Sequence, residues 1–264
     1  MPASGHAIRP GRILVAPPDH HLLLQGEMVL LSRGPREHHT RPAVDPLFRS
    51  AALSQGPRVI GVLLSGGLDD DTAGLQAIKQ CGGLAVVQDP DGAEDPCMPG
   101  AALQAVEVDH CVPLARIAPL LVELVRQTAP ATVAAPSPHL VHEHLAGLGA
   151  DNAMDELRQI GVPSTLACPD CKGALWEIQG AHPPRYRCHT GHGFSLRSLA
   201  AVQQEATENA LWSAVRALQE KELLRKVAAL ERSAGDEDRA QQAEDEAGSL
   251  GDQARMLRSL VERP

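Results

Sequence analysis

A chain of 264 residues has room for one medium domain and a smaller one. Hydrophobic residues make up 43% of the sequence and aromatic residues only 2%, so Ala, Leu and Val must fill the core. The net charge of -9 excludes a nucleic-acid-coating role, which needs a basic face. With no secretory signal pattern and no apolar run of about 18 residues, we expect a cytoplasmic protein that does not insert into a membrane.

The first part of the chain alternates short apolar runs with amphipathic segments, the pattern of an α/β fold. A strand is expected at 12–16, and a hairpin of strands at 22–24 and 28–31 around Gln25-Gly26. Residues 43–53 place apolar side chains at spacings of three and four, which predicts a helix.

A strand, a helix and a second strand are expected at 58–64, 72–81 and 84–88. This unit predicts two parallel strands joined by a right-handed connection. A short strand at 106–108 and a helix with Pro119 in its first turn complete the prediction. Residues 1–128 are therefore interpreted as an α/β domain with a doubly wound parallel sheet that is incomplete at its N-terminal side.

The remainder of the chain divides into three parts. Residues 129–164 begin with a Pro- and Ala-rich stretch and are interpreted as a linker with a short helix at 140–160. Residues 165–196 contain clustered cysteines and histidines. In residues 197–264, two apolar stripes separated by a Gly-containing turn at 233–236 predict an antiparallel helical hairpin.

The cysteine and histidine cluster has the spacing of a metal site. Cys168 and Cys171 are separated by two residues, and Cys188 and His192 lie on a second arm. Three thiolates and one imidazole suit tetrahedral zinc, and four protein ligands leave no open position for catalysis. We therefore predict a structural zinc ion in a zinc ribbon, with His189 as the alternative fourth ligand.

A set of motifs in the first part resembles the C-terminal half of the catalytic domain of the chemotaxis protein-glutamate methylesterase (CheB) family. In chain order they are GRILVAPPDHHL from Gly11, RPAVDPLFRS from Arg41, VLLSGGLDD from Val62, and QDP from Gln88 with CMP from Cys97. The resemblance covers about residues 5–125. The ribbon and helical hairpin resemble the tail of some free-standing family members.

The resemblance implies a hydrolase of the chemotaxis phosphorelay that removes methyl esters from chemoreceptor glutamates through a Ser-His-Asp triad. Matched by position, the triad acid is Asp70. His21, Arg41, Asp45 and Met98 match family positions near the substrate cleft. The family's serine and histidine precede the matched part, so we expect both to be absent from this chain.

Two functions follow from the sequence. The first is that of a methylesterase-family protein whose partner is a methylated chemoreceptor or a related signalling protein. The alternative is a catalytically inactive adaptor in a bacterial signalling pathway, which docks a partner through its zinc ribbon and helices.

Asp69 and Asp71, on either side of Asp70, are expected to be solvated turn residues.

Overall fold

The computed structural model describes residues 4–67, 69, 71–130, 135–149, 151–232 and 237–262. Within these ranges, it describes all side chains except those of residues 230–240 and 243. The chain divides by its contacts into two units, Met1–Ala200 and Ala201–Pro264. The cysteine-bearing segment therefore shares a unit with the α/β segment. None of the helices in the described ranges combines the length and apolar character that crossing a bilayer requires.

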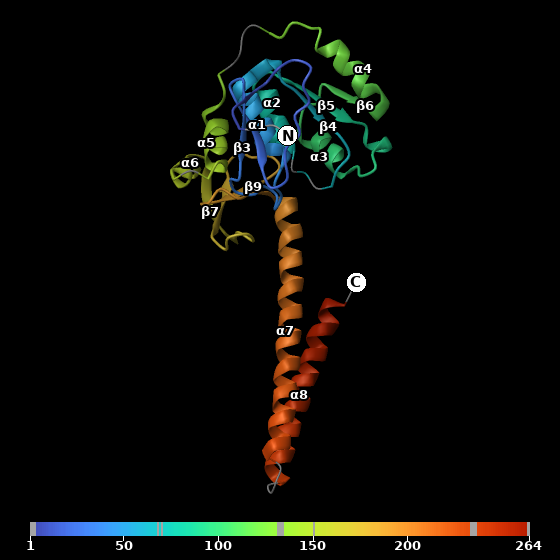
Figure 1. Ribbon diagram of the computed structural model, residues 1–264, viewed down its shortest axis with the longest axis vertical. Coiled ribbons are helices and arrows are strands. Elements are labelled where there is room, and N and C mark those ends of the chain that lie inside the picture. Colours follow the sequence, from blue (N-terminus) through green and yellow to red (C-terminus); the bar gives the residue numbers. More distant parts are fainter. Residues whose placement is uncertain are drawn as a thin grey trace. The chain divides into compact units, whose positions relative to one another are not determined.

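The elements alternate along the first unit and end in two long helices (Figure 1). The strands are β1 (His6–Ala7), β2 (His21–Gln25), β3 (Met28–Ser32), β4 (Ile60–Leu63), β5 (Leu84–Gln88), β6 (His110–Val112), β7 (Gly161–Ala167), β8 (Ala174–Ile178), β9 (Arg185–Cys188) and β10 (Gly193–Ser195). The α-helices are α1 (Val44–Gln55), α2 (Thr72–Gln80), α3 (Cys97–Ala105), α4 (Leu114–Leu124), α5 (Pro138–Gly147), α6 (Ala153–Ile160), α7 (Leu196–Arg232) and α8 (Glu237–Val261). Two short 3-10 helices are η1 (Gly56–Arg58) and η2 (Pro90–Gly92).

The central sheet of the first unit is parallel, in the order β4-β5-β6. Its register pairs Val62 with Val86, and Val86 with His110. The expected parallel pairing of the strands on either side of α2 is confirmed. Because parallel strands end at the same edge, the residues that follow β4 lie at the edge where such sheets gather their functional groups.

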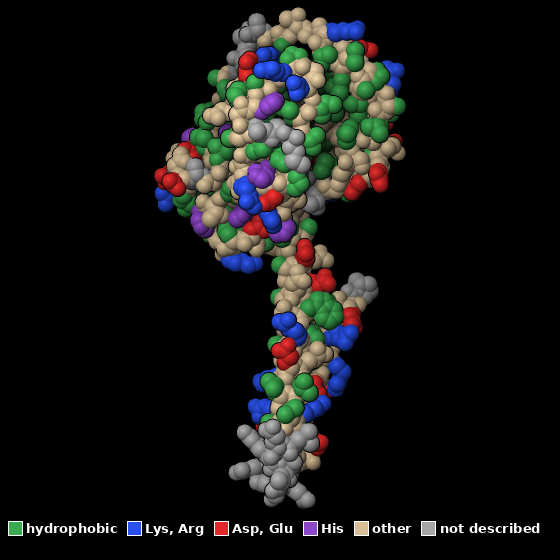
Figure 2. All heavy atoms as spheres, viewed as in Figure 1, with side chains coloured by type: hydrophobic (Ala, Val, Ile, Leu, Met, Phe, Trp, Pro, Cys, Tyr) green, Lys and Arg blue, Asp and Glu red, His purple; other side chains and the backbone are tan. Residues whose placement is uncertain are grey.

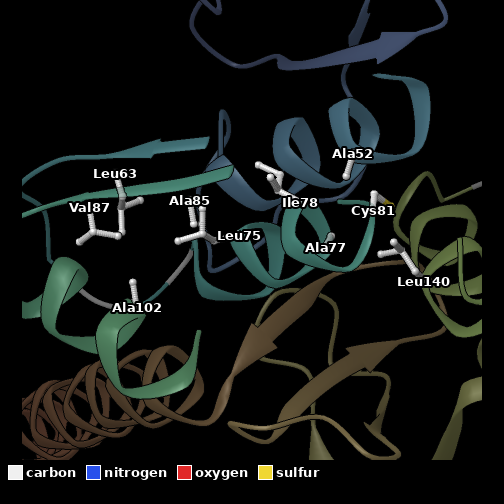
Figure 3. Close-up of a cluster of buried hydrophobic side chains, with 10 residues drawn as sticks. All are labelled: Ala52, Leu63, Leu75, Ala77, Ile78, Cys81, Ala85, Val87, Ala102 and Leu140. Atoms are coloured by element: carbon white, nitrogen blue, oxygen red, sulfur yellow. The ribbon is translucent and has the colours of Figure 1, made fainter. Parts of the chain in front are cut away.

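Small apolar side chains fill the core between this sheet and its helices, as the composition predicts. Figure 3 shows them as sticks: Ala52, Leu63, Leu75, Ala77, Ile78, Cys81, Ala85, Val87, Ala102 and Leu140.

Helices α1 and α2 approach closely because Gly74 has no side chain. A Cβ atom at Gly74 would lie 2.6 Å from the Cβ atom of Phe48.

Several boundaries differ from those expected. The hairpin is confirmed as β2 and β3, with Gln25 paired to Met28. Residues 12–16 form no strand: Ile13 is 92% exposed, and no described strand pairs with this segment. The short strand lies at β6 and not at 106–108, because the amide of Val106 donates to Ala102 and caps α3. Helix α4 begins at Leu114, so Pro119 lies inside it and not in its first turn.

A second, antiparallel sheet carries the cysteines, in the order β10-β9-β8-β7. The two arms of the expected ribbon are the strands β8 and β9, and β7 was not predicted. The helix expected at 140–160 is two helices, α5 and α6, and part of the preceding linker, 131–134, falls outside the described residues. Glu37 forms a parallel bridge to Gly193, so the segment before α1 extends this sheet.

The second unit consists of the long helices α7, from residue 201 onward, and α8, which lie side by side in Figure 1. Arg225 pairs with Glu246 at 2.8 Å, and the guanidinium of Arg258 lies 5.9 Å from the ring centre of Trp212. The small shared core of this unit contains Val215, Ala247, Leu250 and Ala254. Acidic and basic side chains are interspersed on the surface of these helices (Figure 2). The predicted turn at 233–236 lies outside the described residues.

Candidate functional site

The acidic turn, residues 65–74, connects β4 to the first turn of α2. Asp70, the expected triad acid, and Leu68 lie outside the described residues. The expectation that Asp69 and Asp71 are solvated is wrong, because they are only 7% and 0% exposed. The hydroxyl of Ser195 donates to Asp69 at 2.5 Å, and Asp71 accepts from the Thr72 hydroxyl at the start of α2. Carboxylates at this position are favoured by the partial positive charge of a helix N-terminus.

Met98 lies directly against the acidic turn. Its amide donates to the carbonyl of Gly66 at 2.9 Å, and a Cβ atom at Gly66 would lie 2.7 Å from the Met98 sulfur. The turn is also fixed by Ser65, whose hydroxyl accepts from the Asp95 amide at 2.8 Å. Met98, one of the four residues expected to contact substrate, therefore lies beside the described part of this turn.

His21 and Arg41 use their polar atoms to hold the chain between β3 and α1. Nε2 of His21 lies 3.0 Å from the Pro35 carbonyl oxygen, and Nδ1 accepts from the Ala43 amide at 3.3 Å. Burial lowers the pKa of His21. Arg41 donates to Asp19 through Nε and Nη2, and its Nη1 donates to backbone carbonyls. In this geometry both His21 and Arg41 stabilise the segment between β3 and α1.

Asp45 belongs to a buried chain of side chains that the sequence analysis missed. Its Oδ2 lies 3.1 Å from Nε2 of His38, and Nδ1 of His38 lies 3.0 Å from the hydroxyl of Ser198. The order Asp-His-Ser is that of a hydrolase triad, but Ser198 is 0% exposed. The cavity beside His38 and Asp45 measures about 10 Å³, room for about one water molecule. A protein ester could not reach this serine.

The same interior holds a buried ionic network around Glu37. This carboxylate pairs with Arg49, and with Arg187 at 3.1 Å. Burial alone would raise the pKa of Glu37, but Arg187 and Arg49 hold that pKa well below its usual range. Ligand atoms of Glu37, His38 and Asp45 lie within 4.8 Å of one another. Because two guanidinium groups already neutralise Glu37, we interpret this trio as structural and not as a cation site.

The cysteine cluster brings Cys168, Cys171, Cys188 and His192 together, with ligand atoms within 4.8 Å of one another. The Sγ atoms of Cys171 and Cys188 are 3.6 Å apart, and Nδ1 of His192 lies 3.4 and 3.8 Å from Cys188 and Cys168. A tetrahedral zinc ion with bonds of about 2.3 Å to sulfur and 2.0 Å to nitrogen would place its ligands roughly 3.5–3.8 Å apart. The four side chains fit such an ion, and His189 is not one of the four.

The surroundings of the cluster also suit a metal ion. The carboxylate of Asp170 lies 3.9 Å from Nε2 of His192, on the ring side away from the sulfurs. At 3.9 Å the carboxylate is too far away for a hydrogen bond to the ring, but its negative charge favours a cation bound at the cluster.

The first part of the chain is similar to a known protein family. Residues 1–121 match the CheB methylesterase family model. This CheB-type segment contains the acidic turn and ends before the cysteine cluster. Together with the relatives below, the match confirms the resemblance for this segment.

Two curated relatives are named as protein-glutamate methylesterases. A putative protein-glutamate methylesterase/protein-glutamine glutaminase of Leptospira interrogans serogroup Icterohaemorrhagiae serovar copenhageni is 42% identical over 118 residues, 44% of this chain and 61% of the relative. Protein-glutamate methylesterase/protein-glutamine glutaminase 4 of Anaeromyxobacter dehalogenans is 39% identical over 124 residues, 46% of this chain and 35% of the relative. The chain thus spans about three fifths or less of these relatives.

Among solved structures, the catalytic domain of Thermotoga maritima CheB methylesterase is similar to this chain. The identity is 30% and the TM-score 0.45, and the match covers 47% of this chain and 67% of the Thermotoga chain.

Proposed function

We propose that this chain takes part in the hydrolysis of glutamate methyl esters on chemoreceptors, with Asp70 as the acid of a Ser-His-Asp triad. The observation that carries the proposal is the motif VLLSGGLDD, which begins in the last two residues of β4 and continues into the acidic turn, inside the CheB-type segment. A carboxylate at this sheet edge would fix the tautomer of an imidazole and stabilise its charged form. The serine and histidine of the triad would come from outside this chain. Met98, beside the turn, would contact the substrate, and a cytoplasmic location fits this role.

We further propose that Cys168, Cys171, Cys188 and His192 hold a structural zinc ion, in a zinc ribbon that precedes an antiparallel helical hairpin. The spacing of the four ligand atoms supports this assignment. Four protein ligands complete the coordination of zinc, so the ion would stabilise the fold and would not activate water.

Methanol release from a methyl-esterified chemoreceptor tests the first proposal. The chain would be assayed as it stands here and within any longer product of the same gene. Asp70→Asn should reduce the rate roughly 1,000-fold or more, because the imidazole loses the carboxylate that orients it. Asp91→Asn is the matched control, since Asp91 is an exposed acid in the loop that follows β5. Activity that survives Asp70→Asn would refute the proposal.

An adaptor role remains the second candidate, and one observation favours it. Leu223 and Leu224 of α7 and Met256 of α8 are 62%, 68% and 68% exposed. Exposed apolar side chains on charged helices are typical of surfaces that bind other proteins. A pull-down with the full chain and with its Leu223→Glu/Leu224→Glu variant tests this role. A partner held equally by both forms, or by neither, would contradict it.

A further inference from the structure

The acidic turn is held at two points, its middle and its end, by buried side chains from other parts of the first unit. In its middle, the Ser195 hydroxyl donates to Oδ1 of Asp69 at 2.5 Å. At its end, Oδ1 of Asp45 accepts from the amide of Gly74 at 2.5 Å. The segment that carries Asp70 is thus fixed by one residue of α1 and by one residue of the cysteine-bearing sheet.

The two held points are connected to each other by hydrogen bonds. The amides of Ser195 and Ser198 each donate to the other residue's hydroxyl, the Ser198 hydroxyl lies 3.0 Å from Nδ1 of His38, and Nε2 of His38 lies 3.1 Å from Asp45. With its proton on Nε2, His38 donates to Asp45 and accepts from Ser198. None of these side chains, nor Asp69, is more than 7% exposed. Because buried polar networks polarise and rigidify their members, these side chains fix Asp69 and Gly74 of the turn together.

Ser195 also begins helix α7. Its hydroxyl accepts from the Ser198 amide at 3.0 Å, and the Ser198 hydroxyl accepts from the Ser195 amide at 2.9 Å. This reciprocal arrangement is a variant of the capping box, with serine as its fourth residue. The hydroxyl that caps α7 is therefore the one that reaches Asp69.

The residues around the cysteine cluster hold His38 in place. His38 and His39 have φ angles of +52° and +65°, a left-handed conformation that is unfavourable for residues other than glycine. The His38 amide donates to the Gly193 carbonyl at 2.7 Å, and Nδ1 of His39 lies 2.5 Å from Asp170. Asp170 lies between Cys168 and Cys171 in sequence, and Gly193 follows His192, so both contacts depend on the order of the cluster.

We propose that Ser195 and His38 are positioning residues, which let the metal-bound cysteine sheet fix the acidic turn beside Asp70. The inference rests on the proposed function for the importance of Asp70, but the link between cluster and turn can be measured without any esterase activity. Loss of the metal would then loosen the turn as well as the cysteine sheet.

Hydrogen–deuterium exchange of the full zinc-loaded chain tests this link. Ser195→Ala and Asp69→Ala should each make the amides of residues 71–76 exchange roughly ten-fold faster, because each variant removes a buried hydrogen bond to a carboxylate. Asp69→Ala leaves the cap of α7 intact, so agreement between the two variants assigns the effect to the turn. Ser137→Ala is the matched control, since Ser137 caps α5 by accepting from Leu140 and should leave residues 71–76 unchanged.

Removal of zinc by a chelator completes the test. In the unsubstituted chain, chelation should speed exchange at residues 71–76 while β5 stays protected, and in Ser195→Ala it should add little. Exchange at residues 71–76 that is unchanged in both variants, or equal to that of Ser137→Ala, would overturn the proposal. Chelation that exposes β5 as much as the turn would also overturn it, because the metal would then stabilise the whole unit without a specific link.

Discussion

Glu37 gives the sharpest stability prediction, because it is the negative charge between two buried guanidinium groups. Glu37 and Arg49 have side chains 2% exposed, and Arg187 is 3% exposed. Glu37→Gln keeps the size of the side chain but removes its charge. Breaking a buried ion pair by neutralising one partner costs about 3–5 kcal/mol, and we expect the lower value, about 3 kcal/mol. The lower value applies because Glu143 and Asp45 also act on Arg49.

For a unit of this size, about 3 kcal/mol corresponds to a fall in Tm of roughly 6–12 °C. Thermal unfolding followed by circular dichroism would measure it. Asp155→Asn is the control, because the Asp155–Arg158 pair is 73% and 58% exposed and its loss should leave Tm nearly unchanged. Since the pKa of Glu37 is lowered in the folded state, its stabilisation is present above the unfolded pKa of about 4.3 and is lost as the pH falls below that value. The difference in Tm between the unsubstituted chain and Glu37→Gln should therefore narrow in acid. Equal Tm values at pH 7 for Glu37→Gln and Asp155→Asn would show that the charge of Glu37 does not stabilise the fold.

The remaining predictions concern the metal, the pH response and the helix contact. Cys168→Ser should abolish the binding of one zinc per chain, measured by elemental analysis, whereas Cys111→Ser, an exposed thiol outside the cluster, should keep it. Burial lowers the pKa of His144 to about 4, so the uncharged ring favours the folded state, and stability should fall by about 2 kcal/mol as the pH drops from 6.5 to 5. A His144→Gln variant whose denaturation midpoint falls equally over that range would contradict this reasoning. Gly74→Ala should cost about 2 kcal/mol in chemical denaturation, because the new methyl group would overlap Phe48, and an unchanged midpoint would refute the close contact.

The order of apolar, polar and turn residues predicted those strands and turns whose formation depends on neighbouring residues. Alternation and turn residues located the β2–β3 hairpin, and the apolar run before the acidic turn located β4. Helix α3 was missed because its start, Cys97-Met98-Pro99-Gly100, has the composition of a turn, and the 3-10 helix before it hides the boundary. Residues 12–16 have the composition of a strand, but a strand needs a neighbour to pair with.

The site divides in the same way. The cysteine and histidine cluster could be predicted from spacing, because Cys168 and Cys171 share a tight turn whose geometry depends on adjacent residues. The contact between Ser195 and Asp69 joins residues 126 positions apart, and no local pattern encodes it. One signal was available, since a serine just before a long helix and a second serine three residues later, in its first turn, predict a cap. Asp69 was expected in solvent because the sequence gives no indication of the hydroxyl that compensates its burial.

Methanol release tests whether Asp70 serves a methylesterase. With a radiolabelled methyl-esterified chemoreceptor as substrate, a catalytically competent form containing this chain should release methanol, and Asp70→Asn should reduce the rate roughly 1,000-fold or more while Asp91→Asn should not. Equal release by the Asp70→Asn and Asp91→Asn forms would show that Asp70 has no part in the reaction.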